Sequence, residues 1–281
     1  MTWKILQGDN RDTLKTLADN SIDAIVTDPP YGIDFLGKDW DANTGALETY
    51  QECLRVLKPG GHILAFSAAR TYHHLAVTLE QAGFEIRDQI IWLQSNGFPK
   101  STTHLKPQHE PICMAKKKGK TYLNITDTQV NGRYPSNVIG DVEKPYQKYF
   151  YSPKVSRKER HIGYEMPPAL FGNKQGAFDD NGKRYAVELD RREGNVGNNH
   201  PTVKPIELMK YLIKLITPKG GTVLDPFNGS GSTGCAAVDL GYDYIGCELD
   251  PKYVEISEKR IDKWFKTADP IRASGLFEVE E

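Results

Sequence analysis

Hydrophobic and polar positions alternate in two ways along residues 1–116 and again from residue 200 onward. Short, nearly continuous apolar runs such as "IDAIVTD" are typical of strands that are covered on both faces of a parallel sheet. Between these runs, apolar residues recur every three or four positions, which indicates helices with one buried face. The strands are expected at residues 3–9, 22–28, 62–67, 84–94, 110–116, 222–227 and 242–250.

Helices are predicted between these strands, and glycine or proline marks several of their ends. The helix at 44–57 is expected to stop at Pro59-Gly60-Gly61 and the helix at 70–82 at Gly83, because glycine readily adopts the left-handed conformation that ends a helix. Further helices are expected at residues 11–21, 205–217, 251–266 and after the turn that starts at Asn228, with the last dozen or so residues as a tail. This alternation predicts an α/β doubly wound, mostly parallel sheet, with antiparallel pairing of 84–94 and 110–116.

The regular periodicity fails between residues 117 and 199, where glycine, proline, asparagine and charged residues are frequent. A structureless loop of this length is unusual in a compact domain, so we interpret the segment as an inserted recognition region between two halves of the core, residues 1–116 and 200–281. From Ser95 to Pro205 the chain has 19 Lys and Arg against 11 Asp and Glu, a net +8, whereas the rest has 17 against 26, a net −9. A basic block of this kind is compatible with a nucleic-acid face, although a solvated lysine-rich surface gives the same count.

The bulk composition argues against several classes of protein. A chain of 281 residues that is 38% hydrophobic can form a sizeable core, so global disorder is not expected. The first residues, "MTWKILQGDN", lack the apolar stretch of a signal peptide, and no apolar run reaches the length of a membrane span. The four cysteines form no CxxC pair and the seven histidines show no metal-ligand spacing with them, so we expect free thiols in a reducing cytoplasm and no bound metal.

A glycine-rich turn follows the strand at residues 222–227 and opens a helix. In "NGSGSTG", Gly229, Gly231 and Gly234 let the backbone approach a ligand and turn amide N–H groups toward it. Glu248 ends the next strand, where a carboxylate can accept hydrogen bonds from ribose hydroxyls, although it could instead cap the following helix. No lysine follows the glycines as in a P-loop, so an adenosine derivative without a phosphate chain is favoured.

A second site is indicated by "DPPY", at the end of the strand at residues 22–28. Pro29 and Pro30 fix the backbone and carry no N–H, so their carbonyls can accept hydrogen bonds from a substrate. The Asp28 carboxylate and the Pro29 carbonyl supply two acceptors for the N–H bonds of a planar amine, and Tyr31 supplies an aromatic face for its ring. The alternative is that Asp28 caps a helix and the prolines are structural.

Three stretches resemble motifs of the DNA amino-methyltransferases: "DPPYG" the catalytic motif, "LDPFNGSGSTG" the cofactor loop, and "NNHPTVKPIELMKYLI" the motif that precedes this loop. Their order along the chain is that of the beta group, in which the core is circularly permuted and the recognition region lies between its halves. The resemblance covers residues 5–116 and 199–266. It implies a Rossmann-like methyltransferase fold, S-adenosylmethionine as the cofactor, and transfer of a methyl group to an exocyclic amine in double-stranded DNA.

The resemblance also implies a role for each matching residue. Asp28 and the Pro29 carbonyl would hold the amine, within a turn that Pro30 completes, and Tyr31 would stack on a base flipped out of the duplex. Thr202 and Lys204 would hold the methionine carboxylate of the cofactor, although Lys204 could be a surface lysine. The other residues of the cofactor site would be Asp9, Asp225, Phe227, Asn228, Gly229, Gly231 and Glu248. Of these, Asp9 could be only a turn acid.

Candidate contacts to DNA lie in the basic stretches of the middle block. Side chains there could contact phosphates or base edges, or they could belong to a solvated loop. These candidates are Arg133, Lys154, Arg157, Lys158 and Arg160.

Adenine is the expected target base, because Asp-Pro-Pro-Tyr is the commoner form of the motif among the adenine enzymes of this family, whereas cytosine enzymes more often begin it with serine. Cytosine is the alternative within the family. Methylation of RNA or of a protein glutamine, or a non-catalytic DNA-binding role, are alternatives outside it; the intact Asp28, Tyr31 and glycine loop argue against the last. A cytoplasmic location in a bacterium, archaeon or phage is expected, with a homodimer and a restriction nuclease partner as open questions.

Overall fold

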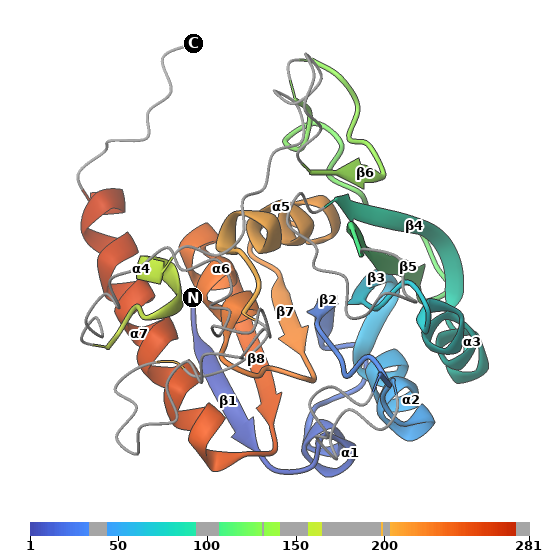
Figure 1. Cartoon of the computed structure of the whole chain (residues 1–281), viewed down its shortest axis with the longest axis horizontal. Helices are drawn as coiled ribbons and strands as arrows, with labels where there is room; N and C mark the ends of the chain where they lie inside the picture. The colour runs from blue at the N-terminus through green and yellow to red at the C-terminus, as the bar shows by residue number, and fades with distance from the viewer. Residues whose placement is uncertain are drawn as a thin grey trace, which may run out of the picture.

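The computed structural model in Figure 1 describes residues 1–33, 44–93, 107–130, 132–140, 157–164, 198 and 203–273. The side chains of residues 157, 158 and 267–273 are not described. Two of the predicted site residues, Lys154 and Thr202, therefore lie outside the described residues, and only the backbone of Arg157 and Lys158 is described.

The described strands form a single sheet in the order β1-β8-β7-β2-β3-β5-β4-β6. The strands are β1 Trp3–Gln7, β2 Ile22–Thr27, β3 Leu57–Phe66, β4 Glu85–Leu93, β5 His109–Lys116, β6 Val138–Ile139, β7 Thr222–Asp225 and β8 Asp243–Glu248. From β1 to β3 every neighbouring pair is parallel, whereas β5 is antiparallel to both β3 and β4. The mostly parallel sheet and its antiparallel pair are confirmed.

Helices cover both faces of the sheet (Figure 1). They are α1 Asn10–Thr13, the 3-10 helix η1 Leu14–Thr16, α2 Leu47–Val56, α3 Tyr72–Ala82, α4 Arg157–Arg160, α5 Ile206–Ile216, α6 Ser232–Leu240 and α7 Pro251–Ala273. One hydrophobic core lies between the sheet and α5, α6 and α7, and a second lies between the sheet and η1, α2 and α3. This is the doubly wound arrangement that the alternating pattern predicts.

The strand β3 shows why the central strands need continuous apolar runs. Leu64 and Phe66 point into the core beside α5, whereas Ile63 and Ala65 point into the core beside α2 and α3. Successive side chains of a strand face opposite sides of a sheet, and here both sides are covered, so all four of these residues are buried.

The boundary between α2 and β3 differs from the prediction. The helix ends at Val56, and β3 already begins at Leu57, so that Pro59, Gly60 and Gly61 belong to the strand rather than to a helix stop. The amide of Gly60 donates to the Lys117 carbonyl at 3.1 Å, and a side chain at Gly60 would meet the backbone of Lys120. Gly60 is therefore needed for the close passage of another backbone segment, a tertiary requirement that the local sequence does not show.

Two other segments also differ from the expected boundaries. The last helix, α7, continues to Ala273 instead of ending at residue 266, and the first predicted helix is reduced to the short α1 and η1. Within the predicted middle region, β6 pairs in parallel with β4, with Ile91 opposite Val138, so this part of the region adds a strand to the edge of the sheet. No described helix combines the length and the apolar character required to cross a membrane.

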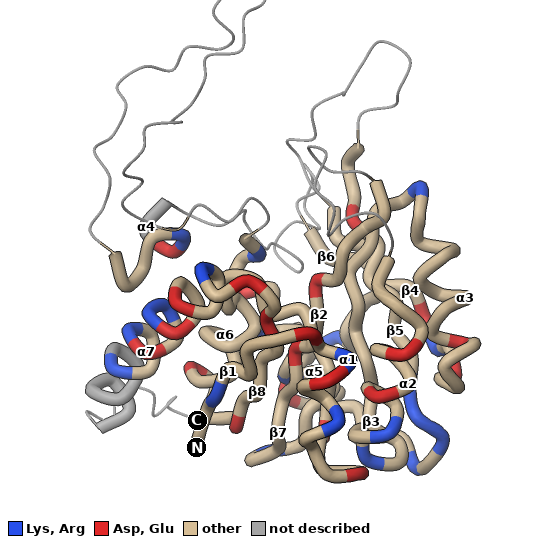
Figure 2. The backbone as a smooth tube through the Cα atoms, turned by 90° about the horizontal axis from the view of Figure 1, so that it is seen from below, with Lys and Arg blue, Asp and Glu red and all other residues tan. Residues whose placement is uncertain are grey.

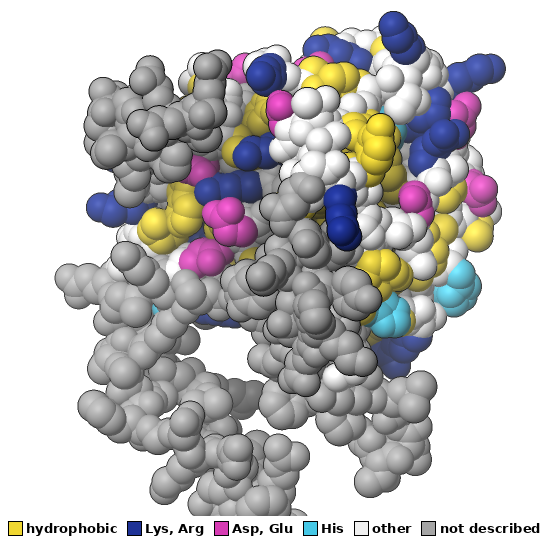
Figure 3. All heavy atoms as spheres, turned by 90° about the horizontal axis from the view of Figure 1, so that it is seen from above, with side chains coloured by type: hydrophobic (Ala, Val, Ile, Leu, Met, Phe, Trp, Pro, Cys, Tyr) yellow, Lys and Arg dark blue, Asp and Glu magenta, His cyan; other side chains and the backbone are white. Residues whose placement is uncertain are grey.

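Acidic and basic residues are mixed on the described surface. Figure 2 shows both signs of charge alternating along α7. On the face in Figure 3, the described Lys and Arg side chains are scattered among hydrophobic and acidic ones. The described residues on that face therefore outline no continuous basic surface.

Candidate active site

The two sequence motifs meet where neighbouring parallel strands end. Ala24 and Ile25 of β2 pair with Val223 and Leu224 of β7, so the carboxyl ends of these strands lie side by side. The hydroxyl of Thr27 donates to the Asp225 carboxylate at 2.6 Å, which joins the last residues of the two strands directly. Ligands of open α/β sheets bind outside such strand ends.

Asp28 lies directly after β2 and contacts two of the predicted site residues. Its Oδ1 accepts a hydrogen bond from the Tyr31 hydroxyl at 2.8 Å, and its Oδ2 lies 2.5 Å from the Lys204 ammonium. Burial, opposed by attraction to Lys204 and reinforced by repulsion from Glu110, raises the pKa of the Asp28 carboxyl above its ordinary value. The structure thus brings Lys204 to Asp28 and Tyr31, although Lys204 is 176 residues from Asp28 in the sequence.

Lys204 is buried, so the alternative that it is a surface lysine is wrong. Its ammonium lies 5.4 Å from the centre of the Tyr31 ring and 5.0 Å from that of the Phe66 ring. Burial alone would lower the pKa of Lys204, but attraction to Asp28 and Glu110 outweighs it and raises this pKa, which keeps the ammonium charged. The described contacts of Lys204 are therefore with Asp28, Tyr31, Phe66 and Glu110, and its predicted contact with the cofactor carboxylate stays a prediction.

Glu110, which the sequence analysis did not single out, completes this cluster. Its Oε2 accepts from the Tyr31 hydroxyl at 2.9 Å and lies 3.6 Å from the Lys204 ammonium. Glu110 is the second residue of β5, and β5 runs antiparallel to β3, so the start of β5 lies beside the carboxyl ends of the parallel strands. An acidic residue at the start of an antiparallel strand is the signal that could have identified it.

Asp225, predicted as part of the cofactor site, holds the glycine loop in place. Its carboxylate accepts hydrogen bonds from the hydroxyls of Thr27 and Thr233, each at 2.6 Å, and from the Phe227 amide at 3.0 Å. Burial raises the pKa of Asp225 to about 6, against the effect of these donors. Asp225 is buried, and its described donors lie in β2, in the loop and in the first turn of α6, so its described contacts position the loop.

Glu248 lies at the end of β8 and contacts the same loop. Its Oε2 accepts from the Gly229 amide at 2.8 Å and its Oε1 from the Asp250 amide at 2.9 Å, so it also orders the turn into α7. Burial raises the pKa of Glu248 to about 7, and the two backbone donors oppose this rise. The side chain is half-buried, and a carboxylate has lone pairs beyond those used here, so further donors can still bind.

The loop itself is shaped by contacts on its inner side. Asn228 is buried and accepts from the Tyr244 hydroxyl at 2.8 Å, while Phe227 stays half-buried, with its ring centre 6.3 Å from that of Tyr50. Gly229 and Gly231 have φ values of 52° and 78°, in the left-handed region that favours glycine. A side chain at Gly231 would meet Ser257 at 2.9 Å, so this glycine is required for packing against α7.

Arg260 of α7 is a second residue that the sequence analysis missed. It is fully buried, and its Nη1 donates to the hydroxyl of Ser230 at 3.0 Å and to the Ser230 carbonyl. Its Nη2 donates to the Glu159 carbonyl at 3.4 Å. The guanidinium therefore fixes the backbone of the glycine loop from behind, and only the packing of α7 against α6 shows this.

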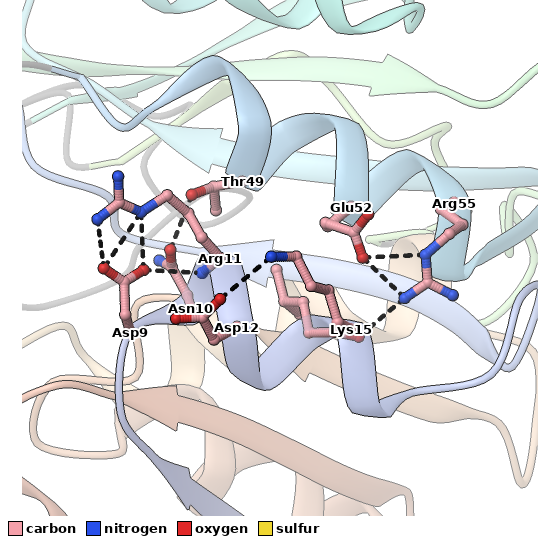
Figure 4. A network of polar contacts seen from close by, with 9 residues as sticks. Asp9, Asn10, Arg11, Asp12, Lys15, Thr49, Glu52 and Arg55 are labelled. Atoms are coloured by element: carbon pink, nitrogen blue, oxygen red, sulfur yellow. Dashed lines mark hydrogen bonds and ion pairs between the residues drawn. The ribbon is translucent and has the colours of Figure 1, made fainter.

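The described contacts of Asp9 are those of a turn acid, the alternative role considered for this residue in the sequence. Figure 4 shows its carboxylate facing the Arg11 guanidinium, and it also accepts from the Arg11 amide at 2.9 Å as the N-cap of α1. The hydrogen bond from Arg11 lowers the pKa of Asp9. The next residue, Asn10, donates to the Pro226 carbonyl at 3.0 Å and accepts from Thr49, so it links this turn to the cofactor loop.

The described candidates for DNA contact lie at different ends of the sheet. Arg133 is exposed in the turn before the edge strand β6, whereas Arg160 ends α4, which lies beside α7 (Figure 1). Burial, together with repulsion from Arg260, lowers the pKa of Arg160. A half-buried arginine of this kind is a poorer candidate for a phosphate contact than the exposed Arg133.

A comparison with known proteins places these features in a family. The family model described as DNA methylase, for enzymes that modify N6 or N4 amines, matches residues 22–259. The chain belongs to this DNA methylase family. The Type II methyltransferase M.HpaI of Haemophilus parainfluenzae is 30% identical to the methylase, over 92% of this chain and 74% of its own length. The DNA adenine methyltransferase YhdJ of Escherichia coli is 28% identical, over 92% and 82%.

A solved structure shows the same fold in a more distant protein. The PvuII DNA methyltransferase, described as cytosine-N4-specific, superimposes with a TM-score of 0.61 over 96% of this chain and 93% of its own, at 17% sequence identity. The predicted family, α/β fold and S-adenosylmethionine cofactor are thereby confirmed, and the methylase is a DNA amino-methyltransferase. Relatives of both base specificities are found, so these comparisons do not decide between adenine and cytosine.

Proposed function

We propose that this methylase methylates the 6-amino group of adenine at specific sites in double-stranded DNA. The observation that carries the proposal is the cluster in which Asp28 contacts both the Tyr31 hydroxyl, at 2.8 Å, and the Lys204 ammonium, at 2.5 Å. These two contacts fix the carboxylate at a strand end beside the cofactor loop, which is where a target amine and a methyl donor have to meet.

The chemistry that this cluster supports begins with the amine. An exocyclic amine of a base is a poor nucleophile, because its lone pair is delocalised into the ring. If the Asp28 carboxylate and the Pro29 carbonyl accept its two N–H bonds, the nitrogen is held toward a tetrahedral geometry and its lone pair becomes available. Bound S-adenosylmethionine would supply the methyl group for this lone pair, and Asp28 would take the proton that the nitrogen then loses.

The charge of the cluster also suits this reaction. Two carboxylates, Asp28 and Glu110, surround one ammonium, that of Lys204, so the group carries a net negative charge when all three are ionised. S-adenosylmethionine supplies a methyl group on a positively charged sulfur. Positive charge passes to the amine nitrogen as the new bond forms, and a fixed anionic group beside the nitrogen stabilises it.

The residues around the glycine loop fit the cofactor. Glu248 offers a half-buried carboxylate for two ribose hydroxyls, and the half-buried Phe227 ring offers apolar surface for the adenine base. Gly229 and Gly231 would let the backbone approach the cofactor, while Asp225 and Asn228 hold the loop. Thr202 and Lys204 stay assigned to the methionine carboxylate as a prediction, and Asp9 to the edge of the site.

The choice of adenine rests on two supports. The motif begins with Asp28 rather than serine, which is the form commoner among adenine enzymes of the family. In addition, a relative that matches 92% of this chain is described as a DNA adenine methyltransferase. Both amines present the same two hydrogens to Asp28, so the cytosine N4 amine is the alternative substrate.

We expect methylated adenine when the protein is incubated with unmethylated DNA of mixed sequence and S-adenosylmethionine. The DNA is digested to nucleosides, and mass spectrometry identifies the product as N6-methyladenosine or N4-methylcytidine in their deoxy forms. The cytosine product would keep the mechanism and replace the base, whereas an unmodified DNA would contradict the proposed function. Sequencing of the methylated DNA then gives the recognition site.

The affinity for S-adenosylmethionine is expected to increase about tenfold between pH 6 and pH 8, because Glu248, whose pKa burial raises to about 7, must be ionised to accept two hydroxyl donors. Isothermal titration calorimetry across this range measures the change. In Glu248→Gln the affinity should be weaker and nearly independent of pH. In the control Asp250→Asn, which retains an N-cap for α7, the affinity should still increase with pH. If the affinity of Glu248→Gln increased with pH as that of wild type does, Glu248 would not belong to the cofactor site.

A further inference from the structure

The Tyr31 hydroxyl lies between two carboxylates but has only one hydrogen to donate to them. The hydroxyl oxygen is 2.8 Å from Asp28 Oδ1 and 2.9 Å from Glu110 Oε2, both hydrogen-bond distances. A phenol has one hydrogen to donate, so it can make a full bond to only one of the two carboxylates. The second contact becomes a full hydrogen bond only if one carboxyl group carries a proton and donates it to the Tyr31 oxygen.

Two hydrogen arrangements satisfy this geometry with the heavy atoms in the same places. In one, Asp28 is protonated and donates to Tyr31, which donates to Glu110; in the other, Glu110 is protonated and donates to Tyr31, which donates to Asp28. Going from the first to the second moves one proton from Asp28 to Glu110. The Lys204 ammonium, 2.5 Å from Asp28 and 3.6 Å from Glu110, lies close enough to both carboxylates to stabilise whichever one is ionised.

We propose that Asp28, Tyr31 and Glu110 form a proton relay, in which the proton that Asp28 takes from the target amine leaves through the Tyr31 hydroxyl to Glu110. This inference rests on the proposed function. Each step balances: the amine N–H proton moves to Asp28 while its bonding pair stays on nitrogen. The Asp28 proton then moves to the Tyr31 oxygen as the Tyr31 hydrogen moves to Glu110, and Glu110 finally releases a proton to water. Asp28 is thereby returned to the carboxylate form that the next amine needs.

The exposure of the side chains indicates that the proton moves from Asp28 toward Glu110 and then to water. The Glu110 side chain is 26% exposed, compared with 18% for Asp28 and 7% for Lys204, so Glu110 is the member of the cluster that water reaches most easily. A base stacked on Tyr31 and held by Asp28 would cover Asp28 further. Burial and the two carboxylates raise the pKa of Tyr31 well above its ordinary value, so the two proton movements through its hydroxyl have to occur together, without a free phenolate.

The kinetic test compares wild type with Tyr31→Phe, Glu110→Gln and the double variant. Tyr31→Phe keeps the stacking ring and Glu110→Gln keeps the shape, so both should bind S-adenosylmethionine and DNA within about twofold of wild type. Each should lower the single-turnover rate of methyl transfer by about 10–100-fold, part of what general base catalysis contributes, and the double variant should be no slower than the slower single variant. Tyr211→Phe on α5 and Glu85→Gln on β4, which pairs with Lys116, serve as matched controls with normal rates.

Two further measurements do not depend on the rate alone. An infrared titration of wild type should detect a carboxyl group that takes up its proton at a higher pH than any carboxyl group of the cluster does in Glu110→Gln, because Asp28 and Glu110 then share one proton through the Tyr31 oxygen. Repulsion from Glu110 contributes to the raised pKa of Asp28, so the acid limb of the rate profile should move to lower pH in Glu110→Gln. A purely structural role of Glu110 would lower the rate without moving this limb.

Several outcomes would overturn the relay while leaving the proposed function intact. These are normal single-turnover rates in both single variants, rate losses that multiply in the double variant, or a weaker DNA affinity that accounts for the whole loss. An infrared titration that is the same in wild type and Glu110→Gln would overturn the shared proton even if the protein transferred no methyl group. A wild-type protein that leaves DNA unmethylated would overturn the proposed function itself.

Discussion

Replacing Asp28 with alanine is expected to lower the single-turnover rate of methyl transfer by about 10²–10⁴-fold, the range that a positioned general base contributes. The variant loses both an acceptor for the amine and the group that takes its proton. The glycine loop is held by Asp225, Glu248 and Arg260, and Asp28 is not among their described contacts. The affinity for S-adenosylmethionine should therefore stay within about threefold of wild type, a difference worth about 0.6 kcal/mol.

Two comparisons make this result specific. Asp28→Asn keeps the volume of the side chain and one carbonyl acceptor but cannot take a proton, so its rate should lie between those of Asp28→Ala and wild type. Asp262→Ala, which removes an exposed carboxylate of α7 that pairs with Lys266, should have the wild-type rate. A turnover of Asp28→Ala close to wild type, with the cofactor still bound, would remove Asp28 from the reaction.

The sequence predicted those parts of the fold that local patterns determine. Continuous apolar runs identified the buried strands, because both faces of the sheet are covered. Helical spacing identified α5, and the glycine-rich turn that precedes α6 identified that helix. The end of α2 was placed too late, since Gly60 serves the close passage of Lys120, and Gly61 that of the Asp23 backbone, rather than a helix stop. Such a contact joins segments far apart in the chain, and no local pattern contains it.

The candidate site was predicted to a similar depth. Asp28, Tyr31 and the glycine loop lie in short contiguous motifs, so the sequence alone could single them out. Glu110 and Arg260 come from separate elements, and they reach the site only because β5 pairs with β3 and α7 packs on α6. Lys204 was found through its motif, but its pairing with Asp28 depends on the end of β2 meeting the segment before α5, which the sequence does not show.

Replacing Lys204 with methionine is expected to destabilise the folded protein by about 3–5 kcal/mol near neutral pH, because removing one partner of a buried ion pair leaves the other charge uncompensated. Methionine keeps most of the apolar contact with Tyr31 and Phe66, so the loss should come chiefly from the charge. Asp28 and Glu110 would then face each other across the Tyr31 hydroxyl without the ammonium that pairs with both. Urea unfolding, followed by circular dichroism at several pH values, measures the effect.

The pH dependence of this loss separates an electrostatic cause from a packing defect. The pKa of Asp28 is already raised by burial, and removing Lys204 takes away the main opposing charge, so this pKa should rise further in Lys204→Met. A carboxyl group whose pKa is higher in the folded state than in the unfolded state stabilises the fold in acid, and that contribution is lost as the pH rises through the folded-state value. The loss of stability in Lys204→Met should therefore be small near pH 5 and grow toward pH 8.

Lys210→Met is the matched control. Lys210 pairs with Glu207 and Asp239, whose side chains are 70% and 25% exposed, so this variant should lose about 1 kcal/mol of stability or less at every pH. An equal deficit for Lys204→Met at pH 5 and pH 8 would mean that Lys204 stabilises the site by packing, and that Asp28 is not held as a paired carboxylate.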